Sequence, residues 1–355
     1  PPARDTPQGH TEVYFLKMAL VYPRKIDLAH TPTPLQYLER ASRQWGRGHR
    51  LWVKRDDLTG CTLSGNKVRK LEFIAAHAID NGYDTLITCG GVQSNHCRAT
   101  ALVGAQLGLG VHLLLRGEEP ADPEGNLLLD HLAGAAVNCY PSEYFVKNIN
   151  TLFSQWQAHY AAQGRNAMLV PTGGSDGIGA WGYIAACEEL AADFRSAGIE
   201  RAHIVTATGS GGTQTGLTLG VALHQLPATV WGINVCDNAQ YFLAKVASDT
   251  ADWRRQYPDA PEVDIEPRVL DGYVGQGYAI ASEEVFALIA QLGRLEGLVL
   301  DPVYTGKAFA GMLAEVAAGR FEGCRDIVFI HTGGIFGLFP QRAGFSRAAF
   351  TEENS

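Results

Sequence analysis

Two lysines at the start of a predicted helix are the first residues whose types and spacing suggest chemistry. The segment Ser64-Gly65-Asn66-Lys67-Val68-Arg69-Lys70 carries a glycine turn into an amphipathic stretch, so Lys67 and Lys70 fall in the first helical turn. The helix dipole disfavours a cation there and so favours the neutral amine that Schiff-base chemistry needs. The pattern indicates an amine nucleophile or an anion-binding lysine. The alternative is a solvated basic face.

A cluster of polar residues follows a double glycine further along the chain. Residues 85–89 are typical of a buried strand, and Gly90-Gly91-Val92 leads from it to Gln93, Ser94, Asn95 and His96. A serine or asparagine at this point could simply cap the next helix. Four consecutive polar residues exceed what a cap needs, so we predict that they bind a ligand. His96 could either orient the loop or transfer protons.

A glycine-rich loop opens another predicted helix after the strand at 203–206. Its residues are Thr208, Gly209, Ser210, Gly211, Gly212 and Thr213, which offer successive backbone N–H groups and three hydroxyls. The loop lacks the lysine of a P-loop and the G-x-G-x-x-G spacing of a dinucleotide site. A hydroxyl-rich glycine loop at a helix N-terminus suits one phosphate, although a plain tight turn would have a similar composition.

These three segments together point to one cofactor. A phosphate cradle, an amine candidate and a polar cluster, without the spacing of metal ligands, are what pyridoxal 5'-phosphate requires of a protein. We therefore predict pyridoxal 5'-phosphate as the cofactor and no metal.

Several motifs resemble one family, in the same order along residues 18–339. They are Pro32-Thr33-Pro34-Leu35, Lys54-Arg55-Asp56-Asp57, the segment from Ser64 to Glu72, Gln93-Ser94-Asn95-His96, Asp301-Pro302-Val303-Tyr304-Thr305-Gly306-Lys307 and His331-Thr332-Gly333-Gly334. All of them resemble the D-cysteine desulfhydrase and 1-aminocyclopropane-1-carboxylate deaminase family. The resemblance implies a two-lobed α/β protein of fold type II, similar to the tryptophan synthase β-subunit, and a homodimer.

The resemblance also implies roles for individual residues. Lys67 carries the cofactor, Lys70 and residues 208–213 bind its phosphate, and Asn95 approaches its phenolic oxygen. Ser94 lies near the carboxylate or Cα of the substrate, and Tyr278 and Tyr304 face the substrate. The expected catalytic residues are thus Lys67, Ser94, Tyr278 and Tyr304, and the expected substrate-binding residues are Gln93, Ser94, Asn95 and His96.

One departure from the family pattern bears on the substrate. Cyclopropane deaminases resemble this chain but have Glu where it has Thr305. Thr305 or Thr332 would offer only a neutral hydrogen bond to the pyridine nitrogen, which makes the cofactor a weaker electron sink. A weaker sink suits a substrate whose leaving group is already reasonable, such as thiolate, better than a cyclopropane ring. We therefore predict α,β-elimination of D-cysteine. The alternatives are cyclopropane deamination, release of sulfite from L-cysteate, for which no extra cation is evident, and a cofactor-binding protein without turnover.

The elements that must position these residues alternate along the chain. Short apolar runs at 85–89, 111–115, 168–171, 203–206, 230–235 and 326–331 are typical of buried strands, and amphipathic helices are predicted at 67–80, 95–107, 178–196, 212–225, 282–295 and 306–318. This alternation predicts parallel sheets flanked by helices. We expect a leader or added segment at 1–17, a large cofactor-binding domain formed by 18–65 plus 180–355, and a small α/β domain at 66–179.

Composition excludes other classes of protein. The net charge of −8 and the absence of a basic tract argue against nucleic acid as a partner. No apolar run approaches the roughly 18 residues of a membrane span. Seven widely spaced cysteines without a C-x-x-C pair favour a reducing cytoplasm over a disulfide framework. A small amino acid is the expected partner.

Overall fold

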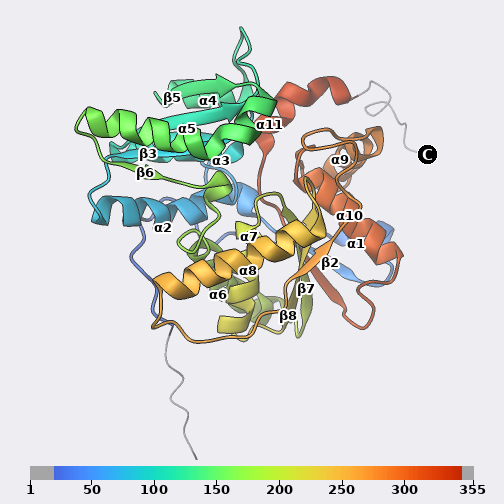
Figure 1. Ribbon diagram of the computed structural model, residues 1–355. Coiled ribbons are helices and arrows are strands. Elements are labelled where there is room, and N and C mark those ends of the chain that lie inside the picture. The colour runs from blue at the N-terminus through green and yellow to red at the C-terminus, as the bar shows by residue number, and fades with distance from the viewer. Residues whose placement is uncertain (1–19, 346–355) are drawn as a thin grey trace, which may run out of the picture.

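The computed structural model describes residues 20–345, in which two sheets and the helices around them form two lobes (Figure 1). The predicted leader at 1–17 lies outside the described residues. Within residues 20–345, every helix is too short or too polar to span a bilayer. The same part of the chain holds no group of His, Cys, Asp and Glu side chains arranged to bind a metal ion.

The larger sheet has six strands in the order β1-β2-β10-β7-β8-β9, and the smaller sheet has four in the order β5-β4-β3-β6. All neighbours are parallel except β1, which pairs antiparallel with β2. The strands of the larger sheet are β1 (Leu35–Tyr37), β2 (Arg50–Lys54), β10 (Asp326–Ile330), β7 (Ala202–Thr208), β8 (Ala228–Asn234) and β9 (Arg268–Leu270). Those of the smaller sheet are β5 (Ala136–Tyr140), β4 (Gly110–Arg116), β3 (Thr85–Gly91) and β6 (Ala167–Leu169).

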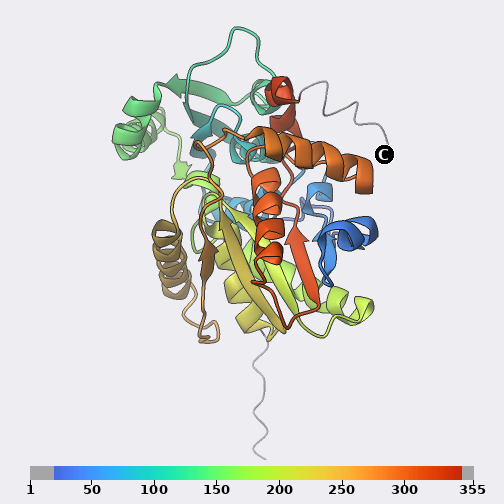
Figure 2. The same ribbon diagram turned by 90° about the vertical axis from the view of Figure 1, so that its right-hand side faces the viewer.

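Helices cover both sheets, as the alternation predicts. They are α1 (Glu39–Trp45), α2 (Lys67–Asp80), α3 (Asn95–Leu107), α4 (Gly125–Leu132), α5 (Ser142–Ala162), α6 (Trp181–Ala197), α7 (Gly212–Leu223), α8 (Ala239–Gln256), α9 (Glu283–Glu296), α10 (Thr305–Ala317) and α11 (Ile335–Leu338). The side view shows the two lobes one above the other, with α11 beside the lobe that contains the smaller sheet (Figure 2). The bounds predicted for α2 and α3 are confirmed to the residue.

Alternation along β4 explains how the smaller sheet is buried on both faces. Val111, Leu113 and Leu115 pack with the side of α3 and α4, whereas Leu114 packs on the opposite face with Phe145 of α5. Side chains of a strand point alternately to the two faces, so one apolar run can serve two layers of helices. The sequence signal for α5 was missed because this long helix buries few of its residues.

The division into domains predicted from the sequence stays a prediction. All strands of the smaller sheet lie between Thr85 and Leu169, within the expected small domain. Helix α2 begins that segment, yet it packs against α6 through a cluster that includes Ile74, Trp181 and Trp253. Figure 1 shows α2 between the two lobes, where it can fix one relative to the other.

A buried ion pair anchors the first turns of α2 to the larger lobe. Arg69 donates to both carboxylate oxygens of Asp56, at 2.8 and 2.9 Å, and to Glu189 of α6 at 2.7 Å. Tyr183 and Thr33 donate to the same Asp56 carboxylate at 2.6 and 2.7 Å. Burial by itself would raise the pKa of Asp56, but the charge of Arg69 and these hydrogen bonds outweigh it and hold that pKa below its usual value. The network therefore joins three segments that are distant in the sequence.

Removing Arg69 should destabilise the fold strongly. The variant Arg69→Met leaves the Asp56 charge buried without its partner, which costs about 3–5 kcal/mol. The matched control is Arg43→Met, because Arg43 pairs with Glu39 on an exposed helix face where such pairs contribute about 0.5 kcal/mol or less. Urea unfolding followed by circular dichroism measures both free energies. Equal, small losses in the two variants would show that the buried pair does not anchor α2.

Candidate active site

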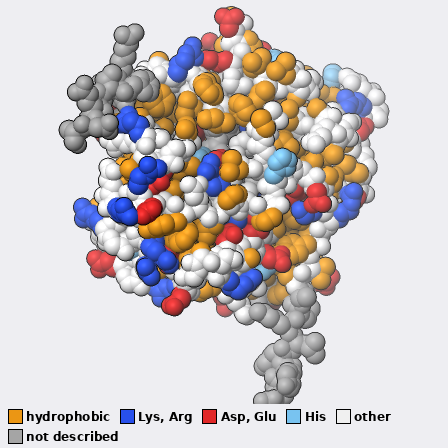
Figure 3. Space-filling model, turned by 180° about the vertical axis from the view of Figure 1, so that it is seen from behind, with side chains coloured by type: hydrophobic (Ala, Val, Ile, Leu, Met, Phe, Trp, Pro, Cys, Tyr) orange, Lys and Arg blue, Asp and Glu red, His pale blue; other side chains and the backbone are white. Residues whose placement is uncertain are grey.

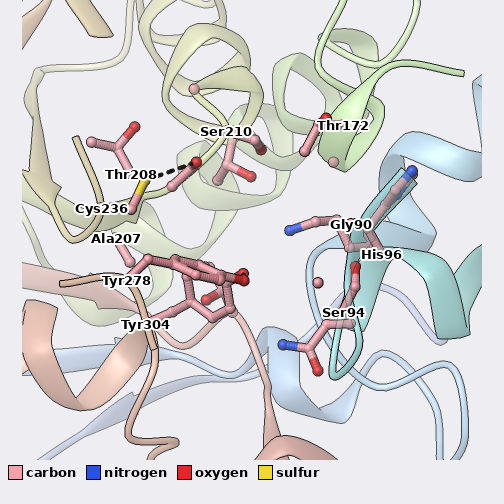
Figure 4. Close-up of a pocket in the computed structure, with 18 of the residues that line it drawn as sticks. Gly90, Ser94, His96, Thr172, Ala207, Thr208, Ser210, Cys236, Tyr278 and Tyr304 are labelled. Carbon is pink, nitrogen blue, oxygen red and sulfur yellow. Dashed lines mark hydrogen bonds between the residues drawn. The ribbon is translucent and has the colours of Figure 1, made fainter. Parts of the chain in front are cut away.

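A cavity of about 250 Å³ lies where the carboxyl ends of strands from both sheets meet. Its walls include Gly90 and Gly91 at the end of β3, Arg116 at the end of β4, and Thr208 at the end of β7. Figure 4 shows Tyr278 and Tyr304 on one side of the cavity, with Ser94 and His96 facing them. Ligands of parallel α/β folds bind at such strand ends, where the helix N-termini also lie.

Lys67 is half-buried and lines this cavity, as predicted for an amine nucleophile. Burial lowers the pKa of its amine to about 8, with help from the charge of Arg98 and against the opposing effect of Asp301. Desolvation, rather than the helix dipole on which the sequence argument relied, is thus the principal cause. Lys67 Nζ donates to Asn66 Oδ1 at 3.2 Å. The amine is therefore held in place and can be neutral near physiological pH.

A close approach of two turns brings Lys67 to the site. Gly65 has φ +111°, and a Cβ on it would lie 2.7 Å from the Thr332 carbonyl oxygen. Asn66 N donates to the same carbonyl at 3.2 Å, so the turn that precedes α2 packs directly on the turn that follows β10. A side chain at position 65 would both strain the backbone and separate these turns.

The glycine-rich loop forms a polar cradle at the N-terminus of α7. All of its residues except Gly212 line the cavity, and the buried Thr208 Oγ1 has no hydrogen-bond partner among the described residues. Thr213 Oγ1 accepts a hydrogen bond from Asn66 Nδ2 at 2.9 Å, which couples the loop to the start of α2. A Cβ at Gly209 would lie 2.9 Å from the Tyr304 ring, so only glycine allows the loop this close to the cavity.

Lys70 lies behind the loop rather than in the cavity wall. It is buried, its Nζ donates to the Gly173 carbonyl at 3.1 Å, and it lies 3.5 Å from Ser175 Oγ. Burial, and then the charge of Lys67, hold its pKa well below the usual value. Ser175 Oγ in turn accepts from Gly212 N at 3.1 Å. The interpretation of a solvated basic face is therefore wrong, and Lys70 stands one layer behind the phosphate cradle.

Sequence reasoning missed two residues that hold this cradle. Ser175 Oγ donates to Ser210 Oγ at 2.9 Å, and Lys245 Nζ donates to the Ser175 carbonyl at 2.9 Å while it pairs with Asp249. The sequence signal near Ser175 is limited to the surrounding glycines, which lie close to the predicted end of the small domain at residue 179. Lys245 lies on α8 with no local feature to distinguish it.

The polar cluster after β3 divides into residues that line the cavity and one that does not. Ser94 caps α3 by accepting from Cys97 N at 3.1 Å, and both Ser94 and Asn95 also line the cavity. Gln93 points instead to the start of α4, where it donates to the Glu124 carbonyl and accepts from Asn126 N, each at 2.9 Å. Gln93 thus positions the loop and does not reach the place expected for a substrate.

The hydrogen bonds of His96 define its tautomer. Thr88 Oγ1 donates its single proton to the Val170 carbonyl at 2.9 Å, so it accepts from His96 Nε2 at 2.8 Å. Burial and the nearby charges of Lys67 and Lys70 keep the pKa of His96 well below its usual value. The ring is therefore neutral with its proton on Nε2. Its buried Nδ1, which has no partner in the described residues, is a free acceptor on a residue of the cavity wall.

The two predicted tyrosines touch each other in the cavity. Their hydroxyl oxygens are 2.6 Å apart, and burial raises both pKa values, that of Tyr304 well above normal. Asp301 orients Tyr304 by accepting from its backbone N–H at 2.9 Å. Lys307 donates to two carbonyls, of Val274 and Gly277, and so fastens the loop that carries Tyr278. The motif beginning at Asp301 therefore positions both phenols.

Thr305 is not placed to donate the hydrogen bond to the pyridine nitrogen that the sequence suggests. Its hydroxyl donates to Asp301 Oδ1 at 2.7 Å and accepts from Asp301 N at 2.8 Å, and it lies outside the cavity wall. The Thr305 hydroxyl both donates and accepts a hydrogen bond with Asp301 at the start of α10, so it is not free for a ligand. Thr332, the other candidate, does line the cavity.

These residues fit pyridoxal 5'-phosphate. The cradle at α7 provides backbone N–H groups and the unpartnered Thr208 hydroxyl for a phosphate. Lys67 provides an amine with a lowered pKa in the same cavity. Asn95 and Thr332 lie in the wall and can offer hydrogen bonds to the ring of the cofactor.

Replacing Lys67 should remove the covalent attachment of the cofactor. Lys67→Ala is expected to abolish the visible absorbance of the purified protein, because no other lysine lines the described cavity. The matched control is Lys147→Ala, on an exposed position of α5, which should keep the absorbance. A Lys67→Ala protein that kept both its colour and its turnover would contradict the assignment.

The lowered pKa of Lys67 should govern how fast the cofactor attaches. An amine with a pKa of about 8 is protonated below that pH and becomes reactive above it. The rate at which apoprotein and pyridoxal phosphate develop visible absorbance should therefore rise with pH and level off above about pH 8. Nα-acetyl-lysine in solution is the control, since its rate should keep rising toward pH 10. Parallel pH profiles would contradict the lowered pKa.

Comparisons with known proteins support the predicted cofactor. The family model "Pyridoxal-phosphate dependent enzyme" matches residues 26–333. The chain is 38% identical over 332 residues to the mitochondrial bifunctional D-cysteine desulfhydrase/1-aminocyclopropane-1-carboxylate deaminase of Arabidopsis thaliana, covering 88% of this chain and 79% of that protein. It is 38% identical over 323 residues to the D-cysteine desulfhydrase of Klebsiella pneumoniae (strain 342), with 90% and 96% covered.

A solved structure leads to the same conclusion. The crystal structure of an ACC deaminase homologue matches with a TM-score of 0.80 and 35% identity, covering 90% of this chain and 95% of that one. The predicted fold type II, the cofactor and the family are thereby confirmed. The chain belongs to the pyridoxal phosphate-dependent enzymes and, among them, to the D-cysteine desulfhydrase and 1-aminocyclopropane-1-carboxylate deaminase family of lyases.

Proposed function

We propose that this enzyme catalyses the α,β-elimination of D-cysteine, which with one water yields pyruvate, hydrogen sulfide and ammonia. The observation that carries the proposal is the pairing of Lys67 with the Tyr278–Tyr304 hydroxyls around one cavity. The names of the Arabidopsis and Klebsiella relatives, both of which include D-cysteine desulfhydrase, support the choice of substrate.

The pKa directions assign different tasks to the amine and the phenols. Bound pyridoxal phosphate supplies the electron sink that makes loss of the α-proton possible. Lys67 Nζ, with its pKa near 8, is suited to accept that proton at neutral pH, a contribution of about 10²–10⁴-fold. Tyr278 and Tyr304 have raised pKa values and keep their protons. They therefore act as hydrogen-bond donors to the substrate rather than as the base that accepts its α-proton.

The substrate carboxylate is best placed at the N-terminus of α3. Ser94 and Asn95 begin this helix and line the cavity, and the free backbone N–H groups of a first helical turn attract an anion. Asn126 Nδ2 donates to Asn95 Oδ1 at 3.0 Å and fixes the orientation of that side chain. The neutral His96 Nδ1 in the same wall can accept a hydrogen bond from the substrate.

Elimination of a thiol is favoured over opening of a cyclopropane ring. Among the described residues, the cavity wall contains a single carboxylate residue, Asp237, in the turn that follows β8. Thr332 would give the pyridine nitrogen only a neutral partner. Both oxygens of Asp301 are occupied by backbone donors, Val303 N in the turn before α10 and Thr305 N at its start. A weaker electron sink suits thiolate, which is already a reasonable leaving group.

The wider predictions follow from the same proposal. The partner is a small amino acid, and the enzyme acts as a homodimer in the cytoplasm. Figure 3 shows basic and acidic side chains interspersed on one face, with no concentration of positive charge there to attract nucleic acid. The seven cysteines are all free, in keeping with a reducing compartment.

A panel of four amino acids tests the substrate. The purified yellow protein should release sulfide and pyruvate mainly from D-cysteine, and little product from L-cysteine, L-cysteate or 1-aminocyclopropane-1-carboxylate. Sulfide, sulfite, pyruvate and 2-oxobutyrate are the measured products, and Lys67→Ala serves as the inactive control. Release of 2-oxobutyrate as the main product would show that a neutral ring partner permits ring opening, and release of sulfite from L-cysteate would identify a sulfo-lyase.

A further inference from the structure

Arg116 is a cation in the cavity wall that the reaction outlined above does not use. It ends β4, is half-buried and lines the cavity, and it stacks over the ring of Tyr278 with its guanidinium carbon 5.1 Å from the ring centre. Its backbone lies beside Gly91 of β3, in register within the smaller sheet. Arg116 thus places a positive charge from one lobe against a catalytic phenol from the other.

The guanidinium of Arg116 has no anionic partner in the described part of the chain. It forms no ion pair or hydrogen bond with a described side chain, in contrast to Arg69, whose guanidinium is saturated by Asp56 and Glu189. Cys89, Cys236 and Tyr278 are the ionisable groups that its charge affects, and all three are neutral because burial raises their pKa values. A half-buried guanidinium with free N–H groups is a preorganised site for carboxylate, sulfonate or thiolate.

The other anions of the reaction already have binding sites. The cofactor phosphate belongs at the N-terminus of α7, with Thr208 in the cradle and Lys70 behind it. The substrate carboxylate belongs at the N-terminus of α3, with Ser94. What remains for Arg116, beside Tyr278, is the group on the β-carbon of the substrate.

We propose that Arg116 binds the sulfur substituent on the β-carbon of the substrate and stabilises the negative charge that this group carries as it leaves. The inference rests on the proposed elimination. In that step the Cα–H bond breaks and its proton passes to Lys67 Nζ, while its electron pair forms the Cα=Cβ double bond. The Cβ–S bond of the protonated thiol breaks with its electron pair on sulfur, which releases HS⁻. The substrate class is therefore amino acids with a thiol or sulfonate on the β-carbon. For a sulfonate, Arg116 would be the extra cation that was not evident in the sequence.

The test compares leaving groups in the holoenzyme. Arg116→Gln should lower kcat/KM for D-cysteine by about 10- to 100-fold, the effect of losing one charge-assisted hydrogen bond, and Arg116→Lys should restore part of it. β-Chloro-D-alanine should lose no more than about 3-fold, because chloride is a much better leaving group than hydrosulfide and depends less on a stabilising cation. The matched control is Arg165→Gln, since Arg165 stacks in the same way on Tyr160 away from the cavity.

A binding measurement separates this inference from the proposed function. Titration of the cofactor's visible absorbance with D-cysteate and with D-alanine gives two dissociation constants for each variant. Arg116→Gln should weaken binding of D-cysteate by about 10-fold or more and leave that of D-alanine unchanged. This result would sustain the role of Arg116 even if D-cysteine were not turned over. Equal losses for both ligands would show that Arg116 merely supports Tyr278, and no loss for either would exclude contact; each would overturn the proposal.

Discussion

The buried pair between Asp56 and Arg69 is the constraint on which the site depends. It ties α2 to the turn after β2, and Glu189 extends the tie to α6. Both charges are almost wholly removed from water, so the pair is stable only while each keeps the other and their hydrogen-bonding neighbours. Lys67 lies two residues before Arg69 on the same helix. Because Arg69 is held against the larger lobe, the opposite side of the first turn of α2, which carries Lys67, faces the cavity.

A second anchor, centred on Asp301, does the same for the phenols. Its carboxylate accepts from the backbone of Val303, Tyr304 and Thr305, while Lys307 on the next turn secures the loop that carries Tyr278. The motif from Asp301 to Lys307 thus contains one residue that lines the cavity, Tyr304, and others that position the two tyrosines. The chemistry is placed between two lobes by charges buried within one of them.

Local signals in the sequence were sufficient where the structure is determined locally. The starts of α2 and α3 at Lys67 and Asn95 were predicted because a glycine turn or a cap precedes each helix. The direction of Lys70 could not be predicted, since it depends on the distant loop that contains Gly173. The hydrogen bonds between Thr305 and Asp301 depend likewise on how the strands and lobes pack. The same holds for the position of Arg116 beside Tyr278. Composition and spacing carry no information about such contacts.

The packing of α2 should select one lysine for the cofactor. Borohydride reduction of the purified protein, followed by peptide mapping with mass spectrometry, locates that lysine directly. We expect a phosphopyridoxyl group on Lys67, which lines the cavity and whose amine has a pKa of about 8. A phosphopyridoxyl group on Lys70, or spread over several exposed lysines, would contradict it.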